Sequence, residues 1–335
     1  MSDLNLTKIG TILTDHKTTF VGKGLKGSIP VLNKNGNHIL RHGAQCAVTK
    51  IRYSDGRTKA LRMWYSESYS FKNICEHISR YIEQKPAPYL LNMSYMSNAI
   101  YFNNEYYPAL LMDWCEGISL REYLNNNIKD KRRLGRLKNF LIDMFKNMNI
   151  RGISHGDIHH NNIYVSAAGA PFLIDYDSMF VQSLKGVKDI CLGYSGFQLP
   201  YGRDNNEILS SKTDYFSQLI VIMTIECLIQ DSGLWLRYYD EDDESSLLFR
   251  KEDYLNLNKS NIYSEIKNLK GDVPFLLNVL EQYLQKSNIN ELWPFYETVN
   301  STKKKQEISY CINCGRKTIE SIDRYCTNCG TLIYA

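Results

Sequence analysis

Three oxygen-bearing side chains lie close together in the middle of the sequence, within the stretch HGDIHHNNIYVSAAGAPFLIDYD at residues 155–177. Small residues separate two short apolar runs in this stretch, a pattern that predicts a β-hairpin. The hairpin would bring Asn162, just before its first strand, close to Asp175, just after its second strand. An amide oxygen and a carboxylate, with phosphates supplying the remaining oxygens, form a ligand set that Mg²⁺ takes. Asp157 lies five residues before Asn162, where it could orient a hydroxyl nucleophile, so the stretch predicts phosphoryl transfer.

The spacing H-x-D-x-x-x-x-N, followed by an apolar pair and Asp, resembles the catalytic loop and the metal-binding Asp of the protein-kinase-like superfamily. This resemblance implies that Asp157 is the catalytic base or orients the nucleophile, and that Asn162 and Asp175 bind Mg²⁺. His159, counted here with the catalytic residues, stands where protein kinases usually carry Lys. The form HGDxH is also similar to aminoglycoside and choline kinases, and Gly156 replaces the Arg of many regulated protein kinases.

Strand patterns precede this stretch. Residues 39–64 predict a three-stranded meander with an Asp-Gly turn at 55–56, and residues 99–102 and 106–112 predict two further strands. Together they would form a five-stranded antiparallel sheet. Gly43 and the small residues after it would let main-chain N–H groups approach phosphates. The likeness to a kinase Gly-rich loop is partial, because one Gly stands where three are expected.

The third predicted strand carries a departure from the kinase pattern. By the resemblance, Val48 and Ala60 would contact the nucleotide, and Arg62 would take the place of the usual Lys. Arg keeps the positive charge and can bind phosphate oxygens bidentately. Glu76, on a helix predicted over residues 69–83, is the first candidate partner of Arg62, with Glu67 and Glu83 as alternatives, and it is counted with the nucleotide-binding residues. The alternative is an Arg on a sheet face that pairs with any carboxylate.

The segment MDWCEG at residues 112–117 resembles the interlobe hinge of kinases. The resemblance implies that main-chain groups around Asp113 and Cys115 bind adenine, and that Met112 controls the rear of the pocket. A Gly between an apolar strand and a helix start is also what any strand-to-helix connection needs. Further along, Tyr176-Asp177 stands where kinases carry Phe-Gly.

Helical periodicity dominates the rest of the chain, over residues 119–127, 134–151, 215–229 and parts of 255–296. His155 could act as a catalytic acid or base, but it is expected to be a packed scaffold residue. The apolar run that begins at Leu219 is too short to span a membrane, and the first residues show no apolar signal region. Nine cysteines without a secretory signal suggest a reducing compartment, so a cytoplasmic location is expected. A formal charge of +4 is too small to argue for nucleic acid or membrane partners.

The last residues form a distinct module after a polar, basic linker. Cys311, Cys314, Cys326 and Cys329 form two CxxC pairs, each followed by Gly. Four thiolates at this spacing predict a closed structural Zn²⁺ site in a module that has almost no core of its own. The module is interpreted as a zinc ribbon, whose role could be docking of a protein partner, contact with nucleic acid or dimerisation.

The predicted fold class is α+β: a bilobal protein-kinase-like fold, with an N-lobe antiparallel sheet plus one helix, a mainly helical C-lobe and a C-terminal zinc ribbon. The expected boundaries are a flexible N-terminal extension at 1–37, the N-lobe at 38–114, the C-lobe at 115–299, a linker at 300–309 and the zinc ribbon at 310–335.

The predicted function is an ATP- and Mg²⁺-dependent phosphotransferase that also holds Zn²⁺, with a protein Ser/Thr hydroxyl as the first candidate acceptor. Two alternatives stay open. One is a small-molecule kinase of the aminoglycoside or choline type, which HGDxH favours. The other is a nucleotide-binding pseudokinase scaffold, which Arg62 and the Gly-poor loop favour.

Overall fold

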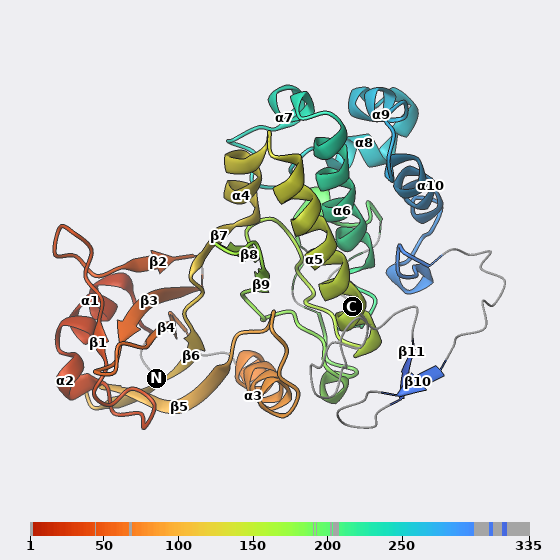
Figure 1. Cartoon of the computed structure of the whole chain (residues 1–335). Helices are drawn as coiled ribbons and strands as arrows, with labels where there is room; N and C mark the ends of the chain where they lie inside the picture. Colours follow the sequence, from red (N-terminus) through yellow and green to blue (C-terminus); the bar gives the residue numbers. More distant parts are fainter. Residues whose placement is uncertain are drawn as a thin grey trace. The chain divides into compact units, whose positions relative to one another are not determined.

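The computed structural model describes residues 3–43, 45–66, 69–189, 191, 193–201, 203, 208–297, 308–310 and 317–319 (Figure 1). The chain divides into two compact units. The first contains Met1–Asn126, His155–Cys191 and Asn206–Leu209, and the second contains Asn127–Ser154, Leu192–Asn205 and Ser210–Ala335. The first unit carries antiparallel sheets and the second is mainly helical, so the predicted α+β class is confirmed.

The main sheet of the first unit is antiparallel and has the strand order β1-β3-β4-β6-β5, with β2 also paired to β3. Its strands are β1 (Ile29–Pro30), β2 (Leu40–His42), β3 (Cys46–Arg52), β4 (Thr58–Trp64), β5 (Met93–Phe102) and β6 (Glu105–Asp113). The predicted meander and the two later strands are therefore confirmed, and β1 makes the sheet one strand larger. The Asp-Gly turn between β3 and β4 forms because Gly56 adopts a φ of 85°, which glycine reaches at little cost.

Two helices, α1 (Leu6–Thr14) and α2 (His16–Thr19), occupy the segment for which the sequence predicts a flexible extension. That prediction is wrong. Asn5 caps α1 by accepting a hydrogen bond from the N–H of Lys8, and Ile9, Ile12 and Leu13 of α1 are buried. Together with β-sheet residues they form one core, which comprises Leu4, Ile9, Ile12, Leu13, Phe20, Leu25, Ala47, Ile51, Leu61, Met63, Ala99, Ile100, Tyr107, Ala109 and Leu111.

Gly22, the first residue of the segment GKGLKG at 22–27, belongs to this packing. The N–H groups of Val21 and Gly22 both donate to the carbonyl oxygen of Ala99 on β5, at 3.1 and 2.8 Å. A Cβ on Gly22 would lie 3.0 Å from the Ala99 Cα. Gly22 therefore allows its backbone to lie close to the backbone of β5 at Ala99.

The first unit also contains α3 (Tyr69–Gln84), which packs against β5, and α4 (Leu120–Asn127), which lies almost entirely in it. A second sheet, in the order β7-β8-β9, consists of β7 (Gly117–Ser119), β8 (Ile163–Ser166) and β9 (Pro171–Leu173). The strands β8 and β9 are the hairpin predicted from the sequence. Because β7 pairs with β8, residues 155–191 belong to the first unit, so the compact units do not follow the expected boundary at residues 114 and 115.

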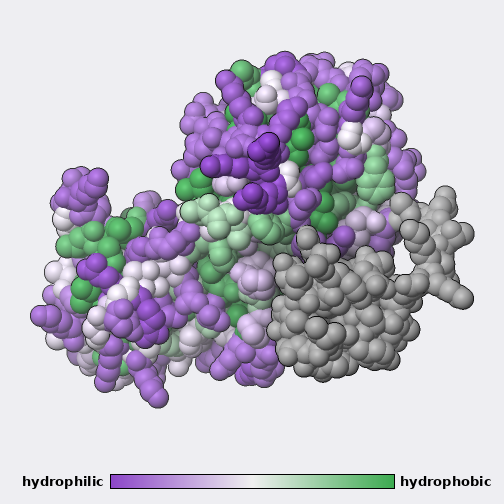
Figure 2. Space-filling view, viewed as in Figure 1, coloured by the Kyte–Doolittle hydropathy of each residue, from purple (hydrophilic) through white to green (hydrophobic). Residues whose placement is uncertain are grey.

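The second unit is built around α6 (Tyr215–Gln230), against which α5 (Lys131–Ile150) and α10 (Val273–Tyr283) pack. Every residue of α6 from Tyr215 to Leu228 is buried, as expected of a central helix. The remaining helices are short: α7 (Gly233–Tyr238), α8 (Lys251–Leu255), α9 (Asn261–Ile266) and the 3₁₀ turns Ser195–Phe197, Leu257–Lys259 and Ile289–Glu291. The face of these helices that Figure 2 shows is mainly hydrophilic, because the apolar side chains are directed into the interior.

Near the C-terminus, β10 (Ile308–Tyr310) and β11 (Lys317–Ile319) pair in antiparallel register. The four cysteines predicted to bind zinc lie outside the described residues. In the part of the chain that is described, no helix has the length and apolar character needed to cross a membrane.

Candidate functional site

A cavity of about 480 Å³ lies in the first unit, against one face of the main sheet. It is lined by most of the residues predicted to bind a nucleotide: Val48, Ala60, Arg62, Met112, Asp113 and Cys115. The strand register explains this convergence. Ala60 and Arg62 lie two residues apart and so share a face of β4, and their cross-strand partners are Met112 on β6 and Val48 on β3. Paired residues project to the same side of a sheet, so local alternation positions all four.

The cavity has the size and composition of a small-molecule site. Pockets of roughly 300–1,000 Å³ with apolar walls and a few polar groups are typical of such sites. Its walls include Ile39, Leu91, Leu110 and Ile174, and its polar end includes Arg62 and Asp175.

Cys115 lies two residues after the end of β6 and lines the cavity. Among the main-chain hydrogen bonds within the described residues, none uses its N–H group. A main-chain donor at the wall of an apolar pocket is the kind of group that binds a heterocyclic base.

Ion pairs hold the polar side chains at the edge of the cavity. Lys59 binds the carboxylate of Asp113 at 2.8 Å, and Asn92 donates to the same carboxylate at 2.7 Å. Burial alone raises the pKa of Asp113, but the bonds from Lys59 and Asn92 bring it below its ordinary value. Lys50 pairs with Glu116 at 2.9 Å. The Asp113 side chain is therefore occupied, and its main-chain N–H donates to the carbonyl oxygen of Asn92 at 2.9 Å, so its contact with adenine stays a prediction.

The loop before β8 is fixed by His155, which is 1% exposed. Its Nδ1 accepts a hydrogen bond from the N–H of Asp157, so its Nε2 carries the proton and donates to the carbonyl oxygen of Ile174 at 2.8 Å. The prediction that His155 is a packed scaffold residue is confirmed.

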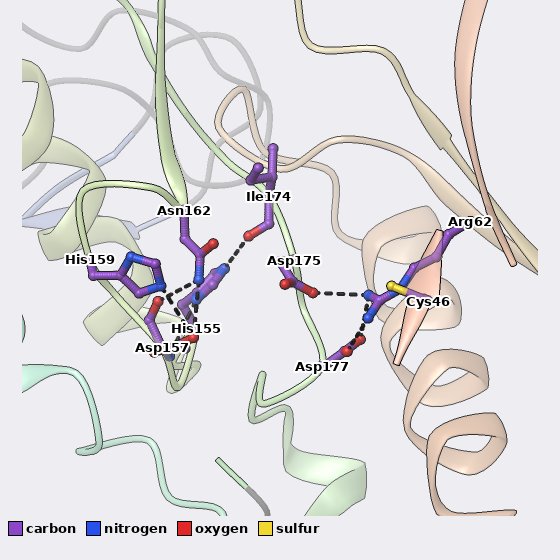
Figure 3. Close-up of polar contacts among 9 residues, drawn as sticks. All are labelled: Cys46, Arg62, His155, Asp157, His159, Asn162, Ile174, Asp175 and Asp177. Carbon is purple, nitrogen blue, oxygen red and sulfur yellow. Dashed lines mark hydrogen bonds and ion pairs between the residues drawn. The ribbon is translucent and has the colours of Figure 1, made fainter. Parts of the chain in front are cut away.

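Asp157 is oriented by two neighbours on the same loop (Figure 3). Asn162 Nδ2 donates to Asp157 Oδ2 at 3.2 Å and to its main-chain oxygen at 3.0 Å. His159 Nδ1 accepts from the N–H of Asn161, so its Nε2 is protonated and faces Asp157 Oδ2 at 3.4 Å. The carboxylate is partly exposed, with 22% of its side-chain surface accessible, and can accept a hydrogen bond from a hydroxyl group.

The hairpin connects this loop to Asp175. The N–H of Ile174 donates to the carbonyl oxygen of Asn162 at 3.0 Å. Asp175 therefore directly follows the last residue that pairs with the opposite side of the hairpin. Asp175 has a φ of 65°, a left-handed conformation that costs energy for a residue with a Cβ. Its side chain is about half exposed and lines the cavity.

Arg62 binds two carboxylates at once (Figure 3). Its Nη1 lies 2.9 Å from Asp175 Oδ1 and 2.8 Å from Asp177 Oδ1, and its Nη2 lies 2.5 Å from Asp177 Oδ2. Its Nε donates to Cys46 Sγ at 3.1 Å. Burial opposes the charge of Arg62, but Asp177 and Asp175 raise its pKa overall. Burial raises the pKa of the Asp177 carboxyl, and Arg62 counteracts this effect.

The expected pairing of Arg62 with Glu76 is corrected by these contacts. Glu76 lies on the exposed side of α3, away from the apolar face that packs on the sheet. Sequence reasoning missed Asp177 as the partner. The available signal was a second carboxylate two residues after Asp175, where the kinase pattern has Gly. Gly43 lies in the turn between β2 and β3, and its N–H donates to the carbonyl oxygen of Cys46, so its phosphate-binding role stays a prediction.

Asn162 and Asp175 are the residues that could hold a divalent cation. Because Asn162 directs its Nδ2 at Asp157, its Oδ1 is turned away from that residue. In the described residues, no group of three or more His, Cys, Asp and Glu side chains is arranged to hold a metal. The amide and carboxylate oxygens nevertheless fit Mg²⁺, which commonly takes one or two protein ligands and completes its shell with phosphate and water oxygens.

Charge also fits a cation at this end of the cavity. The guanidinium of Arg62 and the carboxylates of Asp175 and Asp177 together carry one positive and two negative charges.

Neither a scan against protein-family models nor a search of curated proteins gave a match to this chain.

Proposed function

We propose that the protein is an ATP- and Mg²⁺-dependent phosphotransferase with a bilobal, protein-kinase-like fold. It would transfer the γ-phosphoryl group to a hydroxyl group, with a protein Ser or Thr as the first candidate acceptor. The observation that carries the proposal is the cavity on which residues from β3, β4, β6 and the segment after β9 converge. Each of these stretches resembles a nucleotide-binding part of the kinase-like superfamily in sequence.

Each wall of the cavity has a role in this proposal. The apolar side chains of Val48, Ala60 and Met112 would enclose the adenine ring, and the N–H of Cys115 would donate a hydrogen bond to it. Arg62 would bind phosphate oxygens at the polar end, where Asn162 and Asp175 would hold the metal. The bound Mg²⁺ would supply the positive charge that neutralises the phosphate oxygens.

Asp157 would orient the acceptor hydroxyl and accept its proton. Its carboxylate is held by the Nδ2 of Asn162 and the Nε2 of His159, and both are donors. These two donors fix the position of the carboxylate that would accept the proton. His159 therefore supports Asp157 in this proposal.

The acceptor class rests on sequence features. A zinc ribbon at the C-terminus would serve as a docking element, which favours a protein substrate. The strands β10 and β11 flank Cys311 and Cys314 in the sequence, and a CxxC pair between two short antiparallel strands is typical of a zinc knuckle. The form HGDxH favours an aminoglycoside- or choline-type acceptor instead.

A second candidate function is a pseudokinase scaffold that binds a nucleotide without transferring phosphate. The observation that favours it is the ion pair between Arg62 and Asp175, because it engages the carboxylate proposed to bind the metal. In a scaffold, this pair would persist when the nucleotide binds.

A transfer assay distinguishes these functions. Purified protein is incubated with labelled ATP and Mg²⁺, alone, with a generic protein substrate, and with aminoglycosides and choline. Label transfer that Asp157→Ala reduces by about 10²–10⁴-fold would support the enzyme, since that is the usual effect of removing a general base. Nucleotide-dependent thermal stabilisation without transfer to any acceptor would support the scaffold, and no effect of ATP on either measurement would refute both.

A further inference from the structure

The contacts of Arg62 with its two carboxylates are unequal. Asp177 binds the guanidinium through both of its oxygens, one to Nη1 and one to Nη2, whereas Asp175 binds it through one. Two parallel N–H···O bonds fix the plane of a guanidinium as well as its position. Asp177 therefore determines how Arg62 is oriented.

The two carboxylates also differ in what they face. Asp175 lines the cavity and is 49% exposed. Asp177 is 22% exposed and is not among the residues that line the cavity. Asp177 thus binds Arg62 from outside the cavity lining, while Asp175 lies in the lining, where a ligand would bind.

The main chain on both sides of Asp177 is fixed. The preceding residue, Tyr176, is 2% exposed, and its hydroxyl bonds to the main chain at Leu91 and Leu173. The following residue, Ser178, is buried with its carbonyl group against Gly156. A carboxylate held between two packed residues is preorganised for a fixed partner.

We propose that Asp177 is the positioning residue for Arg62, in the place that the kinase-like pattern gives to a Glu on the helix α3. Asp177 holds the guanidinium bidentately so that Arg62 faces an anionic ligand, the phosphate chain of a nucleotide, while Asp175 is left to the cation. This inference rests on the proposed function, since it assigns a role within the same site.

The remaining hydrogen-bonding capacity of Arg62 agrees with this role. A guanidinium has five N–H groups. Four hydrogen bonds are made to Cys46, Asp175 and Asp177. Within the described residues, one N–H of Nη2 has no hydrogen-bond acceptor. The Nη1 N–H that donates to Asp175 becomes available when that carboxylate binds a cation instead. Arg62 can then donate two hydrogen bonds to phosphate oxygens without leaving Asp177.

A double-mutant cycle on nucleotide affinity tests the proposal. The full-length variants are Arg62→Gln, Asp177→Asn and the combination of both, and the probe is a fluorescent ATP analogue titrated with and without Mg²⁺. We expect Asp177→Asn to weaken binding on the order of tenfold, as expected for losing charge-assisted hydrogen bonds. The combined variant should bind no more weakly than Arg62→Gln alone, because Asp177 acts through Arg62. Asp177→Glu, which keeps the charge, should recover part of the affinity.

A matched control separates positioning from general electrostatics. Asp55 pairs with Arg57 at 2.6 Å on the exposed turn between β3 and β4, so Asp55→Asn removes a similar ion pair away from the cavity and should leave affinity unchanged. Thermal unfolding of every variant is measured in parallel. Loss of thermal stability with unchanged affinity in Asp177→Asn would show a structural role only and would overturn the proposal.

Two further results have distinct meanings. Additive losses in the cycle, or a loss in Glu76→Gln equal to that in Asp177→Asn, would also overturn the positioning role. A wild-type protein that binds no ATP analogue would refute the proposed function together with this inference. Binding to the wild type with no loss in Asp177→Asn would refute this inference alone.

Discussion

The hydroxyl of Tyr176 accepts a hydrogen bond from the main-chain N–H of Leu91 at 2.8 Å. The same hydroxyl donates to the carbonyl oxygen of Leu173 at 2.7 Å. Leu91 lines the cavity, and Tyr176 lies between Asp175 and Asp177. One buried phenol thus joins the segment that carries both acidic partners of Arg62 to the wall of the cavity.

Replacing Tyr176 with Phe should therefore destabilise the protein. The change leaves the buried N–H of Leu91 without its acceptor, which costs about 1–3 kcal/mol in unfolding free energy. Denaturant unfolding measures this loss, and Tyr106→Phe serves as the control because Tyr106 is 50% exposed. Equal stabilities of the two variants would contradict the structural role of the hydroxyl.

Gly156 should tolerate no side chain. Its φ is 83°, and a Cβ would lie 2.0 Å from the carbonyl oxygen of Ser178, a backbone atom with little room to move. Gly152 has a similar φ of 65° but open space around its Cβ position, so Gly152→Ala should cost only the conformational strain of about 1–2 kcal/mol. Gly156→Ala should cost distinctly more. Thermal unfolding of both variants compares them, and similar losses would show that the contact with Ser178 relaxes.

Lys138 should stabilise the second unit through Glu226, whose side chain is 4% exposed. Lys138→Met leaves that carboxylate without its cation, which typically costs about 3–5 kcal/mol. We expect the lower end, because Glu226 keeps hydrogen bonds from Gln230 and from the N–H of Asp272. Arg136→Met, an exposed change on the same helix, is the control for denaturant unfolding.

The effect of Lys138 should depend on pH. Burial lowers the pKa of Lys138, but its bonds to Asp272 and Glu226 raise it overall. A cation whose pKa is higher in the folded state contributes its full stability at pH values below its pKa in the unfolded state, which is about 10.4 for Lys. This contribution is lost as the pH rises through the pKa in the folded state. The stability difference between wild type and Lys138→Met should therefore shrink above about pH 10. A difference that grows with alkaline pH would contradict this assignment.

The full chain should contain one zinc ion. Elemental analysis of the purified protein should find one Zn²⁺ per chain, and the combined change Cys311→Ser and Cys314→Ser should remove it, because a closed site needs all four thiolates. Cys191→Ser is the control, since Cys191 is a free cysteine outside the CxxC pairs. Zinc that persists in the double variant would contradict the predicted ligands.

Much of the fold follows from local patterns in the sequence. The alternation of apolar residues gives the strands β3, β4 and β6, and a strict alternation also places Ala60 and Arg62 on one face. Helical periodicity gives α3 and α6, and the small-residue turn gives the hairpin of β8 and β9. These features depend on neighbours within a few residues, so they can be predicted from the sequence.

The sequence by itself therefore determined β3, β4, β6, the hairpin of β8 and β9, and the helices α3 and α6, but not α1, α2 or β1. Only the tertiary structure decided that α1 packs into the core and that Arg62 pairs with Asp177 rather than Glu76. The physical reason is that an ion pair between residues more than 100 positions apart depends on backbone turns that no local pattern encodes. Here one such turn is the positive φ of Asp175, the second residue after β9.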